Sequence, residues 1–239
     1  MTTAMPTLAV ILFYIFVAVV PALFLMRYIY RKDTVEKEPA GLLVSLVFLG
    51  VAAALVAIVL ESIGEGVLSN FLAEGSPAYT IVTAFLVVAA AEEGAKYFFL
   101  YRRTWKDPNF NYRFDGIVYA VFISLGFAAF ENISYVMGYG LSTAIIRAVL
   151  AIPGHMGFGV FMGLFYGRAK LCADRGDIAG RRKNLWAAYL SAVVLHGFYD
   201  ACALIGSVLS TLLFLAFVVV MYIVVIRMVK RQSATDAPV

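Results

Sequence analysis

The sequence places eight ionisable side chains inside apolar stretches that are long enough to cross a membrane. These residues are Glu92, Glu93, Lys96, Glu131, Arg147, His155, His196 and Asp200. A charge near the centre of a bilayer costs about 2.5–3.5 kcal/mol even on insertion scales, so such groups are expected to face the interior of a helix bundle and to contact one another. Both histidines of the chain belong to this set. The eight residues therefore predict a buried ionisable site that could activate water or carry protons.

Glu92, Glu93 and Lys96 form the densest part of the set. The lysine follows one glutamate by four residues and the other by three, so on a helix it lies between the two carboxylates. One carboxylate can then pair with the ammonium group while the other serves as a general acid or base. The structural alternative is an ion-pair cluster that only fixes helix packing. Two adjacent glutamates exceed what such a cluster needs, which favours chemistry.

The two histidines have different local settings. His196 and Asp200 are four residues apart, so the carboxylate can orient the imidazole or share one metal ion with it. His155 follows Pro153 and Gly154, and the proline removes a backbone hydrogen bond, so this helix is expected to kink or open where the imidazole enters the site. Polar residues that are merely hydrogen-bonded in the bundle core are the alternative for both. Two histidines at similar depth favour a functional role.

Depth in the membrane connects these side chains. At 1.5 Å per residue from the charged boundaries, Glu93 lies about 14 Å deep, the two histidines about 20 Å and Glu131 about 24 Å. Four helices therefore bring them to one layer between mid-membrane and the outer half, as a bundle-core site requires. Glu131 taken alone could be a packed, protonated acid.

Three charged residues lie farther out. Arg147 is predicted near the outer rim, either as an interfacial anchor or as a secondary site residue. Glu61 and Glu65 are predicted to be interfacial at the outer end of the second span, with a role in cation entry or substrate contact as the alternative.

Composition requires that membrane-spanning helices position this site. The chain of 239 residues is 63% hydrophobic and 14% charged, against roughly 45–50% and 25% for soluble domains. Seven apolar runs can each cross a core of about 30 Å, at about residues 8–26, 41–63, 77–101, 115–137, 143–167, 185–205 and 207–226. The predicted fold is an all-α polytopic membrane helical bundle of about seven transmembrane helices. One integral-membrane domain covers residues 1–239, with a motif-bearing core at about 77–205 and a short disordered tail at about 232–239.

The basic residues predict the orientation of the bundle. All of the 19 lysines and arginines except Lys96 and Arg147 lie in alternate connections or after the last span. The positive-inside rule makes those regions cytoplasmic, so the N-terminus is predicted outside and the C-terminus inside. The net charge of +4 is thus explained by topology and by attraction to anionic lipid, and no nucleic-acid partner is expected.

Several known intramembrane chemistries lack their motifs in this chain. The sequence contains no His-Glu-x-x-His zinc helix, no Gly-x-Ser-x-Gly elbow and no Gly-x-Gly-Asp partner for an aspartyl pair. Serine and aspartyl mechanisms are therefore excluded.

Three separated motifs resemble the PrsW family of intramembrane proteases, which belongs to the superfamily that includes the type II CAAX prenyl endopeptidases. Residues 92–96 read Glu-Glu-Gly-Ala-Lys, similar to the family's Glu-Glu-x-x-Lys; residues 127–131 match its Phe-x-x-x-Glu, and residues 196–200 its His-x-x-x-Asp. His155 also looks like a family position. Each motif is weak alone, but their order on separate helices is fairly specific. The resemblance spans about residues 92–200.

The resemblance implies a peptidase that acts on membrane-embedded or membrane-adjacent proteins. Anti-sigma factors are the substrates associated with bacterial members, so the expected partners are a single-span membrane protein and the lipid bilayer, in a bacterial plasma membrane. The residues implied for catalysis are Glu92, Glu93, Lys96, Glu131, His155, His196 and Asp200.

Two mechanisms fit these residues, and the metal-free glutamic one is favoured. In it, Glu92 or Glu93 takes a proton from water while His155 and His196 stabilise the oxyanion, and Asp200 orients His196. In the other, His155, His196 and a carboxylate from Glu131 or Asp200 hold Zn2+ beside an open position for water. The cofactor is accordingly none or zinc.

Two other classes of protein compete with the protease. A proton- or cation-coupled transporter would use the same groups as a relay, and a noncatalytic membrane partner would keep them as a polar lock. The sequence does not indicate an oligomeric state.

Overall fold

The computed structural model describes residues 7–239, and in that range the chain is almost entirely helical. The helices are α1 (Thr7–Lys32), α2 (Ala40–Leu68), α3 (Pro77–Val82), the π-helix η1 (Thr83–Ala89), α4 (Ala90–Thr104), α5 (Asp115–Tyr139), α6 (Leu141–Val149), α7 (Ala151–Asp174), α8 (Ile178–Leu204) and α9 (Val208–Ala234). They form seven segments that are long and apolar enough to cross a membrane. This confirms the predicted all-α bundle and the number of spans.

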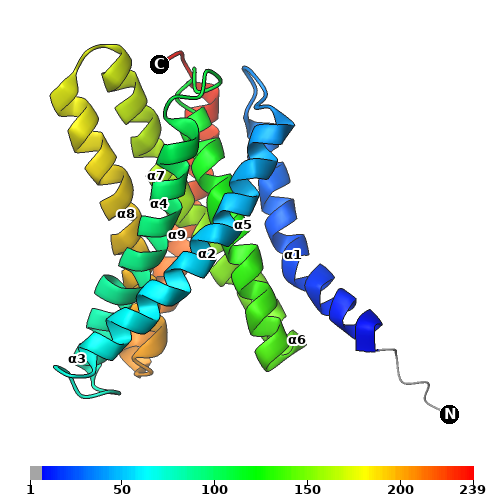
Figure 1. Cartoon of the computed structure of the whole chain (residues 1–239), viewed down its shortest axis with the longest axis vertical. Helices are drawn as coiled ribbons and strands as arrows, with labels where there is room; N and C mark the ends of the chain where they lie inside the picture. Colours follow the sequence, from blue (N-terminus) through cyan, green and yellow to red (C-terminus); the bar gives the residue numbers. More distant parts are fainter. Residues whose placement is uncertain (1–6) are drawn as a thin grey trace.

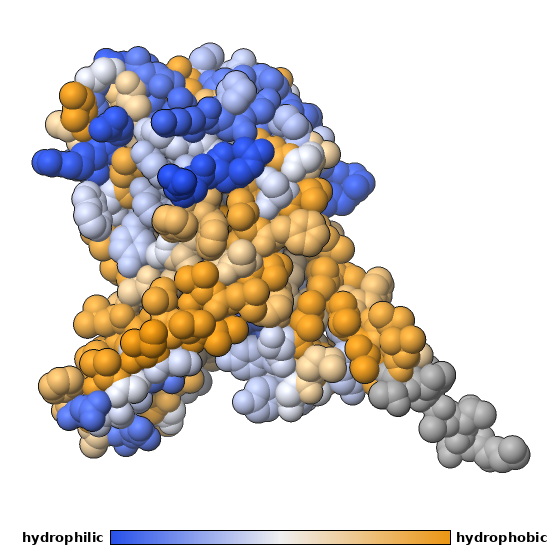
Figure 2. Space-filling view, viewed as in Figure 1, coloured by the Kyte–Doolittle hydropathy of each residue, from blue (hydrophilic) through white to orange (hydrophobic). Residues whose placement is uncertain are grey.

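The basic connections gather at one end of the molecule. Figure 1 shows the α1–α2, α4–α5 and α7–α8 loops and the C-terminus together at the end where the helices converge, while α1 and the α2–α3 hairpin diverge toward the other end. In Figure 2 this converging end is covered by hydrophilic side chains above an apolar belt. The alternation of loops agrees with the charge pattern of the sequence. That this end faces the cytoplasm stays a prediction from the positive-inside rule.

Helix α5 forms the centre of the bundle, because glycines let two neighbours approach its backbone. A Cβ on Gly126 would lie 2.3 Å from the carbonyl oxygen of Val47 on α2, and one on Gly163 of α7 would lie 2.4 Å from the carbonyl oxygen of Gly116 on α5. Small residues allow such backbone contacts between membrane helices. Helices α2, α5 and α7 are thereby held in fixed register around the site.

The fifth span is broken into α6 and α7 close to Pro153. Proline has no N–H, so the carbonyl of Val149 cannot receive its usual helical hydrogen bond. The hydroxyl of Tyr222 on α9 donates to the carbonyl of Val149 and, at 3.1 Å, to that of Leu150. The expected opening of the helix is therefore present, and a side chain from another span satisfies the carbonyl of Val149 that Pro153 frees, while the carbonyl of Leu150 also accepts from the N–H of Gly154 at 3.0 Å.

A second irregular segment lies in the third span. This span runs Pro77–Thr104 and contains the π-helix η1 just before α4, which begins at Ala90. A π-helical turn holds more residues than an α-helical turn, and such turns are frequent at functional sites. Here the segment sets the rotation of α4 and therefore the direction in which Glu92 and Glu93 point.

The C-terminal tail is ordered, although the sequence predicted disorder at about residues 232–239. Helix α9 extends to Ala234. The N–H of Arg113 donates to the carbonyl of Ala237 at 3.1 Å, and the N–H of Val239 donates to the carbonyl of Asn111 at 3.0 Å. The prediction was wrong because it considered only the polarity of the tail, whereas the α4–α5 loop offers backbone groups that the tail can pair with.

Two acidic side chains are buried in the α1–α2 loop at the converging end. Asp33 is 1% exposed and Glu38 is 4% exposed, and Glu38 accepts a hydrogen bond of 2.6 Å from the hydroxyl of Tyr119. Burial raises the pKa of Asp33 to about 6 and the pKa of Glu38 to about 7. The folded protein therefore binds protons that the unfolded chain would release.

The glycine contacts of α5 predict that adding one methyl group at a contact position lowers the free energy of unfolding. Gly126→Ala is expected to lower the free energy of unfolding by about 1–3 kcal/mol, because the new Cβ collides with backbone rather than with a movable side chain. Gly138→Ala on the same helix is the control, since its Cβ would meet nothing within 4 Å. Thermal unfolding of the detergent-purified variants measures both. Equal stability of the two variants would contradict the packing described.

The buried acids predict that stability falls as pH rises. From about pH 4.5, the ordinary pKa of glutamic acid, to about 7, the folded state holds a proton on Glu38 that the unfolded state has lost, so unfolding becomes easier with increasing pH. Glu38→Gln keeps the acceptor for Tyr119 and is expected to flatten this slope, whereas the exposed Glu74→Gln is expected to leave it unchanged. Unfolding midpoints between pH 5 and 8 test this expectation, and a slope as steep in Glu38→Gln as in the wild-type protein contradicts it, since only the share of Asp33 should remain.

Candidate active site

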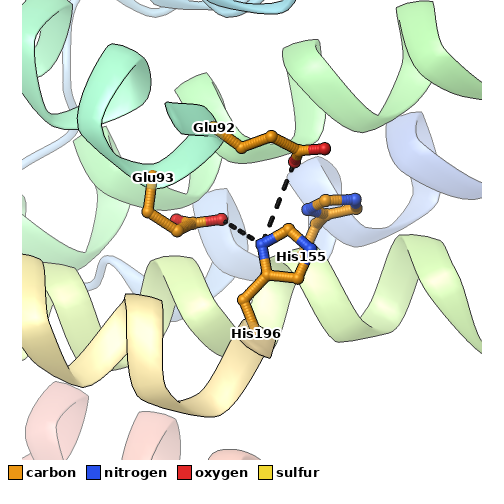
Figure 3. Close-up of side chains that lie close together, drawn as sticks. All are labelled: Glu92, Glu93, His155 and His196. Atoms are coloured by element: carbon orange, nitrogen blue, oxygen red, sulfur yellow. Dashed lines mark hydrogen bonds and ion pairs between the residues drawn. The ribbon is translucent and has the colours of Figure 1, made fainter. Parts of the chain in front are cut away.

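Three helices bring two glutamates and two histidines together in the middle of the bundle. Glu92 and Glu93 come from α4, His155 from α7 and His196 from α8, and one ligand atom from each lies within 4.8 Å of the others. Figure 3 shows the two carboxylates pointing at His196. Nδ1 of His196 lies 2.9 Å from Oε1 of Glu93 and 3.9 Å from Oε2 of Glu92. All four residues are buried, and we call them the four-residue cluster.

Lys96 lies at the centre of this arrangement, as its spacing predicted. Its Nζ is 3.0 Å from Oε2 of Glu92 and 2.8 Å from Oε1 of Glu93. The same Nζ is 3.2 Å from Nδ1 of His155 and 3.7 Å from the centre of the Phe127 ring. The ammonium group is fully buried. Its charge is therefore balanced only by these neighbours.

A carboxylate supports each histidine from the side away from the cluster. Oε2 of Glu131 lies 2.9 Å from Nε2 of His155, and Oδ2 of Asp200 lies 3.3 Å from Nε2 of His196. The Nδ1 atoms of both rings face the cluster. This is the arrangement in which an outer carboxylate orients a histidine and sets its tautomer. The predicted metal-ligand set placed Glu131 or Asp200 beside the histidines on one ion, whereas the structure brings Glu92 and Glu93 to that position.

A cavity of about 660 Å³ opens next to the cluster, and only one of the two cluster glutamates lines it. The lining includes Glu92, Glu131, Arg147, His155, His196 and Asp200. Glu93 and Lys96 do not line it and are each 0% exposed. Glu92 is therefore the cluster carboxylate that faces the space where a substrate and water can enter.

The cavity extends to residues that the sequence placed near the membrane surface. Glu61 and Glu65 of α2 line it, so the substrate-contact alternative suits them better than a purely interfacial position. Arg147 of α6 also lines it, and its Nη2 forms an ion pair of 2.8 Å with Oε2 of Glu131. Of the two predicted alternatives for Arg147, this position suits a secondary site residue better than an interfacial anchor.

Two aromatic residues of the site escaped the sequence analysis. The Phe158 ring stacks on the His196 imidazole with centroids 4.7 Å apart, and Tyr222 caps the break before α7. Phe158 follows His155 by three residues and so shares its helical face, which was an available signal. Tyr222 could be found only from the need for a donor to the carbonyl of Val149, which Pro153 leaves without its helical partner.

The four-residue cluster fits a zinc ion. Two imidazoles and two carboxylates are donors that zinc commonly takes, and Oε2 of Glu93 is buried without a hydrogen-bond partner among the described residues. The ammonium group of Lys96 already contacts three of the four residues. A zinc ion held here would share Glu92, Glu93 and His155 with this ammonium group.

Fold and site together define a multi-pass membrane protein with buried carboxylates and imidazoles of the kind that hydrolases use. Residues 38–228 match the model of a family described as PrsW family intramembrane metalloprotease. The chain belongs to the PrsW family and is thus a protease. Because the family match and the seven apolar segments agree, it is also a multi-pass membrane protein.

Relatives cover most of the chain. It is 36% identical over 182 residues to Protease PrsW of Geobacillus kaustophilus, which is 76% of each chain. It is 34% identical over 219 residues to Protease PrsW of Halalkalibacterium halodurans, covering 92% of this chain and 96% of the relative. Protease PrsW of Bacillus subtilis is 32% identical over 182 residues, covering 76% of this chain and 78% of the relative. No solved structure matches this chain significantly.

Proposed function

We propose that this protein is an intramembrane endopeptidase that hydrolyses peptide bonds of single-span membrane proteins. The observation that supports this most is the four-residue cluster, which lies beside a cavity of about 660 Å³ in a bundle of membrane-length helices. Membership in the PrsW family supports peptide hydrolysis over transport by the same groups. Anti-sigma factors are the substrate class that the motif resemblance implies, and the bacterial relatives support a plasma membrane as the location.

Glu92 is the residue that we assign as general base. It is the cluster carboxylate that lines the cavity, and its Oε2 lies 3.0 Å from Nζ of Lys96. A carboxylate placed in this way can take a proton from water as the water attacks the scissile carbonyl, and can then deliver it to the leaving amine. The ammonium group of Lys96 balances negative charge on Glu92 throughout.

We assign Glu93, His155 and His196 as the residues that would bind a metal ion. If zinc is bound, these three residues are its ligands, and the ion would polarise the carbonyl and activate water. The two histidines would bind the ion through Nδ1, because Glu131 contacts Nε2 of His155 and Asp200 contacts Nε2 of His196. The donor set and the family description favour this metal-supported version over the metal-free glutamic mechanism favoured by the sequence.

The position of the cavity supports cleavage in the outer half of the membrane. Its lining reaches Glu61 and Glu65 at the diverging end of α2, away from the basic loops. We propose that the scissile bond of the substrate lies nearer its extracytoplasmic end.

Substitution of Glu92 is expected to separate the chemical step from metal binding. Glu92→Gln should lower cleavage by at least about 10²-fold because the amide cannot accept the proton. Glu92→Asp should also lose much activity, since it withdraws the carboxylate by one methylene. Glu74→Gln is the control, because it removes an exposed carboxylate that does not line the cavity. Product analysis by mass spectrometry on a panel of single-span substrates measures the rates and maps the cleaved bond. Full activity of Glu92→Gln would assign the base elsewhere.

Metal content distinguishes the two mechanisms. The purified protein is expected to hold one zinc ion per chain, and chelation is expected to stop cleavage. His155→Ala, His196→Ala and Glu93→Ala should each lose the metal, whereas Glu92→Gln and Glu74→Gln should retain it. Elemental analysis of the same preparations provides the readout. Cleavage by metal-free protein would restore the glutamic mechanism, and the absence of both metal and products across the panel would favour transport.

A further inference from the structure

Arg147 occupies a position that neither peptide hydrolysis nor the three motifs explain. It lies on α6, outside the motif residues, and its side chain is 14% exposed. The guanidinium lies 3.9 Å from the centre of the Tyr135 ring, and its Nη2 forms the 2.8 Å ion pair with Oε2 of Glu131. The ion pair with Glu131 and the contact with the Tyr135 ring hold the guanidinium beside the carboxylate, although Nη2 has no hydrogen bond of regular geometry among the described residues.

The oxygen atom that Arg147 contacts is also the one that supports His155. Oε2 of Glu131 lies 2.9 Å from Nε2 of the imidazole. A carboxylate paired with arginine accepts hydrogen bonds and cannot donate them, so Nε2 must carry the ring proton. On the opposite side of the ring, Nδ1 lies 3.2 Å from Nζ of Lys96, and an ammonium group only donates. Both neighbours therefore require the same tautomer of His155.

His196 reaches the same arrangement without an arginine. Its supporting carboxylate, Asp200, is four residues away on α8, so the helix itself sets their separation. In the described part of the chain, Asp200 forms no ion pair other than the one with His196. Glu131 supports His155 from a different helix, since the glutamate is on α5 and the histidine on α7. A contact across helices needs a further group to hold it in place.

We propose that Arg147 is a positioning residue for His155. It orients the Glu131 carboxylate, and through this carboxylate it holds His155 as the Nε2–H tautomer with the Nδ1 lone pair directed into the four-residue cluster. The relay thus runs from α6 through α5 to α7. The break between α6 and α7, with its carbonyls held by Tyr222, sets the short helix that carries Arg147 beside the cavity.

The tautomer of His155 can be read directly, because the chain has only two histidines. Protein labelled with ¹⁵N-histidine, treated with chelator and held in detergent, gives one set of ring-nitrogen signals per histidine, and His155→Gln and His196→Gln assign them. In Arg147→Gln, the Nε2–H signal of His155 is expected to shift and broaden, since the carboxylate that accepts its proton is no longer oriented, while Lys96 still keeps Nδ1 unprotonated. The His196 signals are expected to stay unchanged and so report on the fold. Arg147→Lys retains the charge and is expected to keep the wild-type signals in large part.

Each outcome of this measurement bears on the proposal. An unchanged Nε2–H signal of His155 in Arg147→Gln overturns it. A change of both histidines in either variant also overturns it, because Arg147 would then support the whole bundle rather than one imidazole. A change confined to His155, with recovery in Arg147→Lys, supports it.

The kinetic readout rests on the proposed function, whereas the tautomer readout does not. Arg147→Gln is expected to lower kcat on the order of tenfold or more with little change in KM, as is typical when an outer partner of a site histidine is removed. A rise in KM with unchanged kcat would make Arg147 a substrate contact and contradict the positioning role. Absence of cleavage by the wild-type protein would refute the proposed function but leave the tautomer result valid.

Discussion

The buried ammonium group of Lys96 is the interaction on which the arrangement of the site depends. It contacts Glu92, Glu93 and His155, and it lies against the face of Phe127. An isolated charge could not remain at this depth, and two adjacent carboxylates could not remain there without a cation. One lysine for two glutamates leaves the cluster with more negative than positive groups, so a proton or a further cation completes the balance. The cluster therefore balances most of its charge through internal contacts and keeps the capacity to bind a proton or a further cation.

Irregular backbone next to the site makes this compensation possible. The π-helix η1 precedes the two glutamates, the break at Leu150 precedes His155, and glycines allow α5 to contact α2 and α7 through the backbone. Non-helical backbone at membrane depth is tolerated only where other groups satisfy it, and Tyr222 does so for the break. Each irregularity changes how one helix faces its neighbours. Straight helices with the same motifs would hold the same residues at the same depth but at different rotations.

Sequence reasoning identified the residues of the site but not their relative roles. Continuous apolar runs bounded by charged stretches predicted the seven spans, and the cost of burying charge singled out the glutamates and histidines. Spacing along a single helix correctly placed Lys96 between its glutamates and Asp200 beside His196, since both relations are fixed by helical geometry. Relations between helices were not accessible. The position of Glu131 behind His155, the ion pair to Arg147 and the bond from Tyr222 all depend on helix rotation, which no local pattern encodes.

The same geometry explains why the motif contains two consecutive glutamates. Successive residues on a helix point about 100° apart, so Glu92 and Glu93 cannot both face the cavity. Glu92 lines it, while Glu93 turns into the protein and contacts Lys96 and Nδ1 of His196. A carboxylate that exchanges protons with a substrate must reach the cavity, whereas one that fixes a lysine and a histidine must be shielded from it. No single side chain can meet both requirements, and adjacent positions on one helix are the shortest way to provide them together.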